Sequence, residues 1–184
     1  MVSMAQKVLH VSESNEWSGG GAQLLALAEG LKAKGWEVLV ACRPGSGLFN
    51  HALKRGLETF TVPLREDYDL ASAARLARLV STRGIDVIHA HHNRSHAVCL
   101  LAKLILAASG RRPVLVVSRR VSFPPGRNPF SQWKYRSGFI DRIDAVADAV
   151  KDVLVEAGVK PARVVVIRIG VDLERFRPRR SDSA

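Results

Sequence analysis

Short apolar runs alternate with helix-like segments along the chain, and this alternation restricts the fold more than any other feature of the sequence. Residues 7–12 carry branched apolar side chains in the pattern of a buried parallel strand. Three consecutive glycines, Gly19 to Gly21, then open a helix that is expected to end at Gly35, with an apolar stripe at Leu24, Leu27, Ala28 and Leu31. Further strands are expected at 37–42, 58–62, 85–91, 113–118, 145–147 and 163–169, and helices at 48–54, 70–83, 93–109 and about 150–157. This order predicts a doubly wound, Rossmann-like α/β fold, with a parallel sheet of about seven strands and helices on both faces.

The segment 119–138 interrupts the alternation. Its prolines and Gly126 predict an irregular stretch without a helix or strand. Basic side chains are interleaved there with aromatic ones, a mixture that suits a membrane interface and also single-stranded nucleic acid. We expect Arg127, Trp133, Lys134 and Arg136 to form a surface for a membrane or another anionic partner; a plain packing loop is the alternative.

The charge of the chain favours an anionic partner. Lys and Arg number 28 against 17 Asp and Glu, a formal net charge of +11, which suits nucleic acid, a phosphorylated ligand or an acidic membrane surface. Cys42 and Cys99 have no metal-ligand spacing, so we expect buried free thiols in a reducing cytoplasm. We expect one domain over residues 1–170 and a polar linker or tail over 171–184. No stretch is long and apolar enough to span a bilayer, which predicts a cytoplasmic protein, with peripheral attachment at the inner membrane face as a further expectation.

Ligands of doubly wound sheets bind at the carboxyl ends of the strands, which selects residues 14–21, 91–96 and 118–123 as the working edge. Glycines after the first strand allow a phosphate to approach the backbone amides at the start of a helix; a tight turn without a ligand is the alternative. A dinucleotide fingerprint is absent because Leu24 stands where its last glycine belongs, and Cys42-Arg43 replaces the acid expected after the second strand. The sequence also lacks a P-loop and a nucleophile elbow.

Six segments together resemble family 4 retaining glycosyltransferases. They are 20–23 (Gly-Gly-Ala-Gln), 86–91 (Asp-Val-Ile-His-Ala-His), 119–123 (Arg-Arg-Val-Ser-Phe), 134–136 (Lys-Tyr-Arg), 144–150 (Asp-Ala-Val-Ala-Asp-Ala-Val) and 170–176 (Gly-Val-Asp-Leu-Glu-Arg-Phe). The resemblance covers essentially the whole chain. It implies the N-terminal, acceptor-side domain of a two-domain GT-B enzyme, with a C-terminal donor-binding domain as its partner.

The resemblance also implies roles for individual residues. Gly19, Gly20 and Gly21 would approach the donor diphosphate, and the acceptor-side residues would be His91, His92, Asn93, Arg94, Arg119 and Arg120. Many relatives carry a histidine after the fifth strand, where this chain has Ser118-Arg119-Arg120, and arginine stays protonated near neutral pH. No catalytic residue is therefore assigned. His89 and His91 lie on one face of a strand, but with no third ligand evident we expect no metal.

The sequence therefore predicts a domain that helps to transfer a sugar from a nucleoside diphosphate sugar, with retention, to a glycan or lipid-linked acceptor. The nucleotide sugar is a substrate, and no cofactor is expected. Alone, the domain is expected to turn over little or no sugar. A non-catalytic sugar-nucleotide or glycan-binding module is the first alternative. Nucleic-acid binding through the positive charge ranks last because the sequence holds no nucleic-acid motif.

Overall fold

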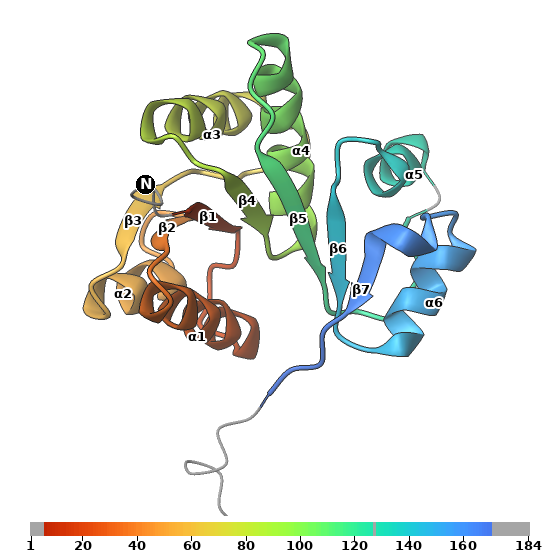
Figure 1. Cartoon of the computed structure of the whole chain (residues 1–184), viewed down its shortest axis with the longest axis horizontal. Helices are drawn as coiled ribbons and strands as arrows, with labels where there is room; N and C mark the ends of the chain where they lie inside the picture. Colours follow the sequence, from red (N-terminus) through yellow and green to blue (C-terminus); the bar gives the residue numbers. More distant parts are fainter. Residues whose placement is uncertain (1–5, 127, 171–184) are drawn as a thin grey trace, which may run out of the picture.

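The computed structural model describes residues 6–126 and 128–170, and within them seven parallel strands form one sheet (Figure 1). The strands are β1 (Lys7–Ser12), β2 (Glu37–Cys42), β3 (Glu58–Thr61), β4 (Val87–Ala90), β5 (Val114–Arg119), β6 (Arg142–Ala145) and β7 (Val164–Val166). Their order is β3-β2-β1-β4-β5-β6-β7. Successive connections reverse direction between β1 and β4, which is the switch point of the sheet. The predicted doubly wound fold is confirmed.

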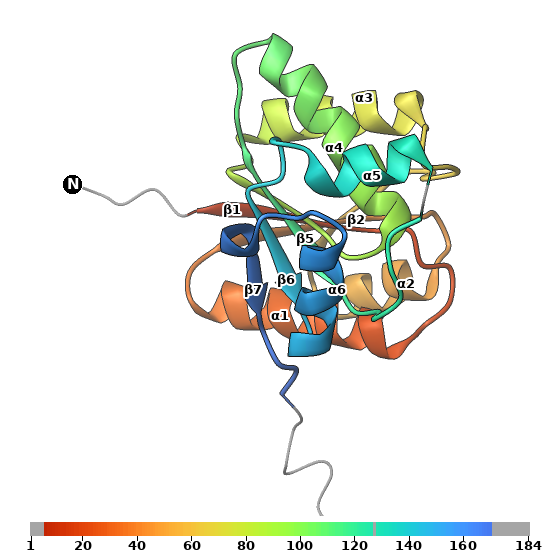
Figure 2. The same cartoon turned by 90° about the vertical axis from the view of Figure 1, so that its right-hand side faces the viewer.

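Helices cover both faces of the sheet (Figure 2). They are α1 (Gly19–Ala33), α2 (Gly47–Lys54), α3 (Leu70–Arg83), α4 (Asn93–Ala108), α5 (Pro129–Arg136), α6 (Asp148–Glu156) and a short 3₁₀ helix (Pro161–Arg163). Helices α1 and α2 share a core with Val8 and Val40. Helices α3 to α6 contribute to a second core around Leu9, Ile88 and Leu115 on the opposite face. Right-handed crossovers produce this division, because β1 to β3 advance in one direction along the sheet and β4 to β7 in the other.

Helix α5 lies inside the segment that was predicted to be irregular, and that prediction is wrong. Pro129 occupies the first helical position, where the absence of an N–H costs no hydrogen bond and the fixed φ favours a helix. The Asn128 side chain caps the helix by accepting the Ser131 amide at 2.7 Å. The same residues that disfavour a continued strand therefore start a helix.

The last two strands also differ from their predicted positions. Strand β6 spans Arg142–Ala145, whereas 145–147 was predicted, and Ala147 is the residue that precedes α6. Strand β7 covers only Val164–Val166 of the predicted 163–169. Ile143 and Ala145 are buried in the α3–α6 core, while Arg142 and Asp144 point to the other face of the sheet, which no described helix covers here. Polar and apolar residues alternate along β6, and for that reason the strand was not predicted at its true position.

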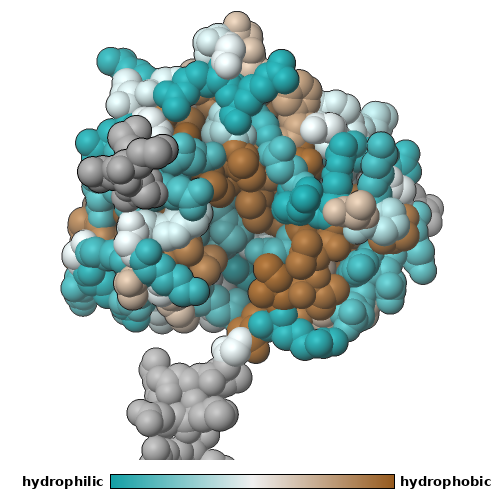
Figure 3. Space-filling model, viewed as in Figure 1, coloured by the Kyte–Doolittle hydropathy of each residue, from teal (hydrophilic) through white to brown (hydrophobic). Residues whose placement is uncertain are grey.

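Apolar surface lies over β5 to β7 on the α1 side of the sheet (Figure 3). Val165 and Ile167 are exposed there, and so is Leu27 of α1, with 40% of its surface accessible. Leu27 was predicted to join the apolar stripe of α1, and this prediction is wrong. The side chain instead lines a cavity of about 220 Å³ between α1 and the end of β7.

Candidate functional site

The carboxyl ends of β1 and β4 meet at the switch point, and their loops leave in opposite directions to α1 and α4. A cavity of about 450 Å³ lies there. Its lining includes Glu13, Ser18, Gly20, His91, His92 and Arg120. The three segments selected from the sequence as the working edge therefore contribute to one cavity.

The start of α1 borders this cavity through Ser18 and Gly20. Ser18 caps the helix and accepts the Gly21 amide at 3.4 Å, whereas the amides of Gly19 and Gly20 have no acceptor within the described residues. A Cβ atom on Gly20 would lie 3.3 Å from His92 Nε2 and 3.8 Å from Arg120 Nη1, so a side chain there would crowd the cavity. Free amides at the start of a fifteen-residue helix attract an anion.

The start of α4, by contrast, already holds an anion from the chain itself. The Glu13 carboxylate accepts the backbone amides of Arg94 and Ser95, each at 2.9 Å. This contact links the β1 loop to the first turn of α4 and neutralises that helix terminus. Within the described residues, Asn93 is left as the one amide of this turn without an acceptor, against the two of Gly19 and Gly20 at the start of α1. Sequence analysis did not single out Glu13, although its place directly after β1 indicates the sheet edge.

Arg120 is fixed at the cavity by a two-pronged contact with His91. Its Nη1 donates to the His91 carbonyl oxygen and its Nη2 contacts His91 Nδ1, both at 3.1 Å. Burial lowers the pKa of Arg120 from its ordinary value, while the charge of Asp144 opposes that shift. The guanidinium has five N–H donors, so several remain for a ligand.

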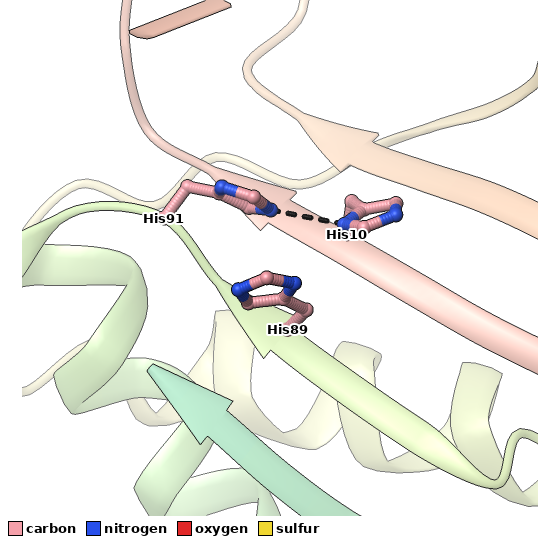
Figure 4. Close-up of side chains that lie close together, drawn as sticks. All are labelled: His10, His89 and His91. Carbon is pink, nitrogen blue, oxygen red and sulfur yellow. Dashed lines mark hydrogen bonds between the residues drawn. The ribbon is translucent and has the colours of Figure 1, made fainter. Parts of the chain in front are cut away.

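Three histidines, His10 on β1, His89 on β4 and His91 just after β4, lie close together at the switch point (Figure 4). His10 Nδ1 lies 2.9 Å from His91 Nε2, and His89 Nε2 contacts Ser118 Oγ at 2.8 Å and Asp144 Oδ2 at 3.2 Å. Burial lowers the pKa of His10 well below the usual histidine value, and His89 lowers it further. Burial is also the main cause of the low pKa of His91, followed by His89, His10, Arg120 and His92. Both rings are therefore neutral at pH 7.

The same three histidines form the one metal-ligating cluster found among the described residues, with candidate atoms within 4.8 Å of one another. A metal bound through His91 Nε2 would leave the ring proton on Nδ1, directed at the donor N–H of Arg120. The contact between Arg120 Nη2 and His91 Nδ1 and metal ligation through His91 Nε2 are therefore mutually exclusive, while the bond from Arg120 Nη1 to the His91 carbonyl is compatible with either. Sequence analysis missed His10, which the pairing of β1 with β4 places opposite His89.

The predicted acceptor-side residues divide between two cavities. His91, His92 and Arg120 line the first, while Arg94 lines a second cavity of about 570 Å³ beside α5. Asn93 and Arg119 line both, as do Phe123 and Tyr135. Arg119 is buried and donates to the Tyr135 hydroxyl and the Phe123 carbonyl, so much of its donor capacity is used within the protein.

The predicted basic and aromatic surface is incomplete. Lys134 is almost fully buried, with its ammonium contacting Asn93 Oδ1 at 2.8 Å and Asp67 Oδ2 at 3.3 Å. Its assignment to an exposed surface is therefore wrong; the ammonium joins α5 to the start of α4. Trp133 and Arg136 are exposed, and Arg127 lies outside the described residues, as does the expected tail 171–184.

His96, in the first turn of α4, is a further cavity residue for which sequence analysis assigned no role. It is fully buried, and neither ring nitrogen has a well-formed hydrogen bond within the described residues. Its ring packs edge-on against Tyr135, with centroids 4.9 Å apart. Burial lowers its pKa well below the usual value, assisted by the nearby charge of Lys134.

A doubly wound sheet with an open helix start and a fixed arginine at its switch point has the architecture of phosphate-binding α/β domains. Residues 17–175 match the sequence model of Glycosyltransferase Family 4. The chain belongs to glycosyltransferase family 4, as the sequence resemblance predicted. No curated protein sequence matches the chain. Within the described residues, no helix has both the length and the apolar character that crossing a bilayer requires.

Solved structures share this fold, including one named as a glycosyltransferase and one named as a galactosyltransferase. Anabaena Alr3699/HepE in complex with UDP superposes with a TM-score of 0.74 at 16% identity, over 92% of this chain and 45% of its own. A Rickettsia africae glycosyltransferase gives 0.75 at 16% identity, over 95% and 46%. The lipopolysaccharide outer core galactosyltransferase WaaB gives 0.67 at 10% identity, over 91% and 47%. The present chain therefore spans less than half the length of each of these proteins.

Proposed function

We propose that this domain supplies part of the donor diphosphate site, and the acceptor side, of a glycosyltransferase that uses a nucleoside diphosphate sugar. The observation that carries the proposal is the contrast between the two helix starts. Glu13 occupies two amides of α4, while the Gly19 and Gly20 amides of α1 have no acceptor within the described residues and Gly20 lies beside the guanidinium of Arg120. Amides and a bidentate cation are the groups that bind a diphosphate. The UDP and UDP-glucose complexes of HepE support this choice of donor.

In this proposal the domain assists the reaction electrostatically. The bond between the sugar carbon and the diphosphate oxygen breaks, and its electron pair stays on the diphosphate. The acceptor hydroxyl oxygen forms the new bond on the same face of the sugar, which retains its configuration, and the hydroxyl proton passes to a phosphate oxygen. Arg120 and the two free amides would stabilise the negative charge that develops on the leaving group.

The acceptor is assigned to the second cavity, which joins the first around Arg119 and Tyr135. Tyr68 and Phe130 stand there with ring centroids 4.2 Å apart and offer apolar faces to a sugar ring. The guanidinium of Arg94 also lines this cavity and suits an acceptor that carries a phosphate or carboxylate. We infer a phosphorylated or lipid-linked glycan as the acceptor.

Attachment to an anionic membrane surface at the inner face remains part of the proposal. Trp133 and Arg136 are exposed on α5, close to the proposed acceptor cavity, and Phe139 is exposed just after the helix. An aromatic ring with a neighbouring cation is suited to the boundary between head groups and acyl chains. Lys134 takes no part in this surface because its ammonium is buried.

Equilibrium binding of UDP-glucose to the 184-residue chain, measured by calorimetry, tests the donor assignment. Arg120→Gln removes a charged hydrogen-bond donor, which is worth about 2 kcal/mol, so affinity should fall roughly 30-fold. Arg142→Gln is the matched control, since Arg142 is exposed at the opposite, amino-terminal edge of the sheet. Equal affinities for the two variants, or no binding by the unmodified chain, would contradict the proposal. Binding without any transfer when an acceptor and a donor-binding domain are supplied would favour the non-catalytic module.

A further inference from the structure

The contact between Arg120 and His91 determines where the ring protons of two buried histidines lie. Arginine carries only donors, so His91 Nδ1, 3.1 Å from Arg120 Nη2, must be the acceptor. A neutral His91 therefore carries its proton on Nε2, which lies 2.9 Å from His10 Nδ1. His10 in turn must accept at Nδ1 and carry its own proton on Nε2. Two consecutive hydrogen bonds thus connect Arg120 through His91 to His10, each with the donor on the side of Arg120.

The unpaired N–H of His10, at the end of this series of hydrogen bonds, destabilises the folded state. His10 is fully buried, and its Nε2 has no hydrogen-bond partner within the described residues. An unpaired buried donor destabilises the folded state, and an apolar residue of similar size would avoid that cost. Val8, two residues earlier on the same face of β1, shows that this face accepts an aliphatic side chain. The histidine at position 10 therefore calls for an explanation other than packing.

We propose that His10 is a positioning residue: by accepting a hydrogen bond from the Nε2–H of His91, it holds His91 in the tautomer that clamps Arg120 beside Gly20. His10 does not line the cavity, so it acts only through His91. Without an acceptor at position 10, the Nε2–H of His91 is unpaired and the Nδ1–H tautomer gains weight. That tautomer directs a donor at Arg120 and releases one prong of the clamp. This inference rests on the proposed function, since it assigns Arg120 to the donor diphosphate.

Replacing His10 with Asn or with Gln separates the effect of its hydrogen bond to His91 from the effect of losing the imidazole ring. The Asn side chain places its oxygen near the position of Nδ1, so His10→Asn keeps an acceptor for His91. The Gln side chain reaches instead toward the position of Nε2, so His10→Gln removes that acceptor while remaining polar. His10→Leu removes all polar atoms. Val8→Ala, a neighbouring core truncation, controls for loss of stability.

The first measurement is made without ligand, on the ¹⁵N-labelled chain. Long-range ¹H–¹⁵N spectra should show both His10 and His91 protonated on Nε2 and unprotonated on Nδ1. In His10→Leu and His10→Gln, His91 should become a mixture of tautomers, while His10→Asn should keep it on Nε2. A single, unchanged His91 tautomer in every variant would overturn the proposal. Addition of Zn²⁺ that shifts all three ring systems and moves the His91 proton to Nδ1 would also overturn it, in favour of a metal site.

The second measurement is UDP-glucose affinity. His10→Gln and His10→Leu should weaken binding about fivefold, His10→Asn and Val8→Ala less than about twofold, and the effect should vanish when Arg120→Gln is also present. An equal loss with and without Arg120 would assign His10 a merely structural role. The two measurements together distinguish the proposed function from the proposed role of His10. If the tautomers are as predicted but Arg120→Gln does not weaken binding, the donor assignment is contradicted and the coupling of His10 to Arg120 is not.

Discussion

Mild acidification is expected to destabilise this domain strongly, because His10, His91 and His96 are buried as neutral rings. The pKa of each lies well below the usual histidine value in the folded state, with burial as the main cause. The unfolded chain therefore binds more protons than the folded one below about pH 6.5, so the free energy of unfolding falls as pH falls. Each such histidine contributes about 1.4 kcal/mol between pH 7.5 and pH 5.5, and three contribute about 4 kcal/mol. His92, with a pKa lowered by burial, acts in the same direction.

Urea unfolding at three pH values between 7.5 and 5.5 measures this effect, and His96→Leu provides the internal check. His96 has no well-formed hydrogen bond within the described structure, so an apolar replacement should leave stability at pH 7.5 nearly unchanged. It should also reduce the loss on acidification by about one third, or 1.4 kcal/mol. Equal unfolding free energies at pH 7.5 and 5.5 for the unmodified chain would refute the reasoning, as would an unchanged pH dependence in His96→Leu.

Two further predictions concern the contact between Gly47, at the start of α2, and Trp17, and the start of α4. Gly47→Ala would place a Cβ atom 2.6 Å from the Trp17 backbone nitrogen, so unfolding in urea should show a loss of about 2–3 kcal/mol. Gly30→Ala, in the interior of α1 where the new Cβ would meet open space, should instead raise the free energy of unfolding by about 0.5–1 kcal/mol. A similar loss of stability in both variants would contradict the close contact between Gly47 and Trp17. Glu13→Gln removes a carboxylate that accepts two amides of α4, with an expected cost of about 1–2 kcal/mol. Hydrogen exchange at those two amides should accelerate, and unchanged protection would contradict the capping role.

The order of strands and helices could be predicted because the two sequence patterns that indicate it, apolar runs and helix-ending residues, are both local. The apolar runs of the central strands and the helix ends, such as the left-handed Gly84 after α3, depend on few neighbours. Strand β6 was misplaced because Arg142 and Asp144 interrupt its apolar pattern, and that interruption reflects a face without a covering helix. Helix α5 was missed because Pro129 indicates either a break or a helix start, and the side-chain cap that decides between them is a contact in space.

The candidate site could be predicted only as far as the strand ends. The sequence placed Gly20, His91 and Arg120 at one edge of the sheet because parallel strands end together. It gave no sign that Glu13 would occupy one helix start and leave the other open, since that depends on the direction of two loops. The partner of His91 was equally hidden, because His10 comes opposite β4 only through the register of non-consecutive strands. Burial of Lys134 depends on its contact with Asn93, forty-one residues away in the sequence.

A crystal structure of the 184-residue chain with UDP bound tests the central claim most directly. The account predicts diphosphate oxygens at the Gly19 and Gly20 amides and within hydrogen-bonding distance of the Arg120 guanidinium, with Glu13 still bound to the start of α4. A diphosphate at the start of α4 with Glu13 displaced, or one bound away from the switch point, would contradict it.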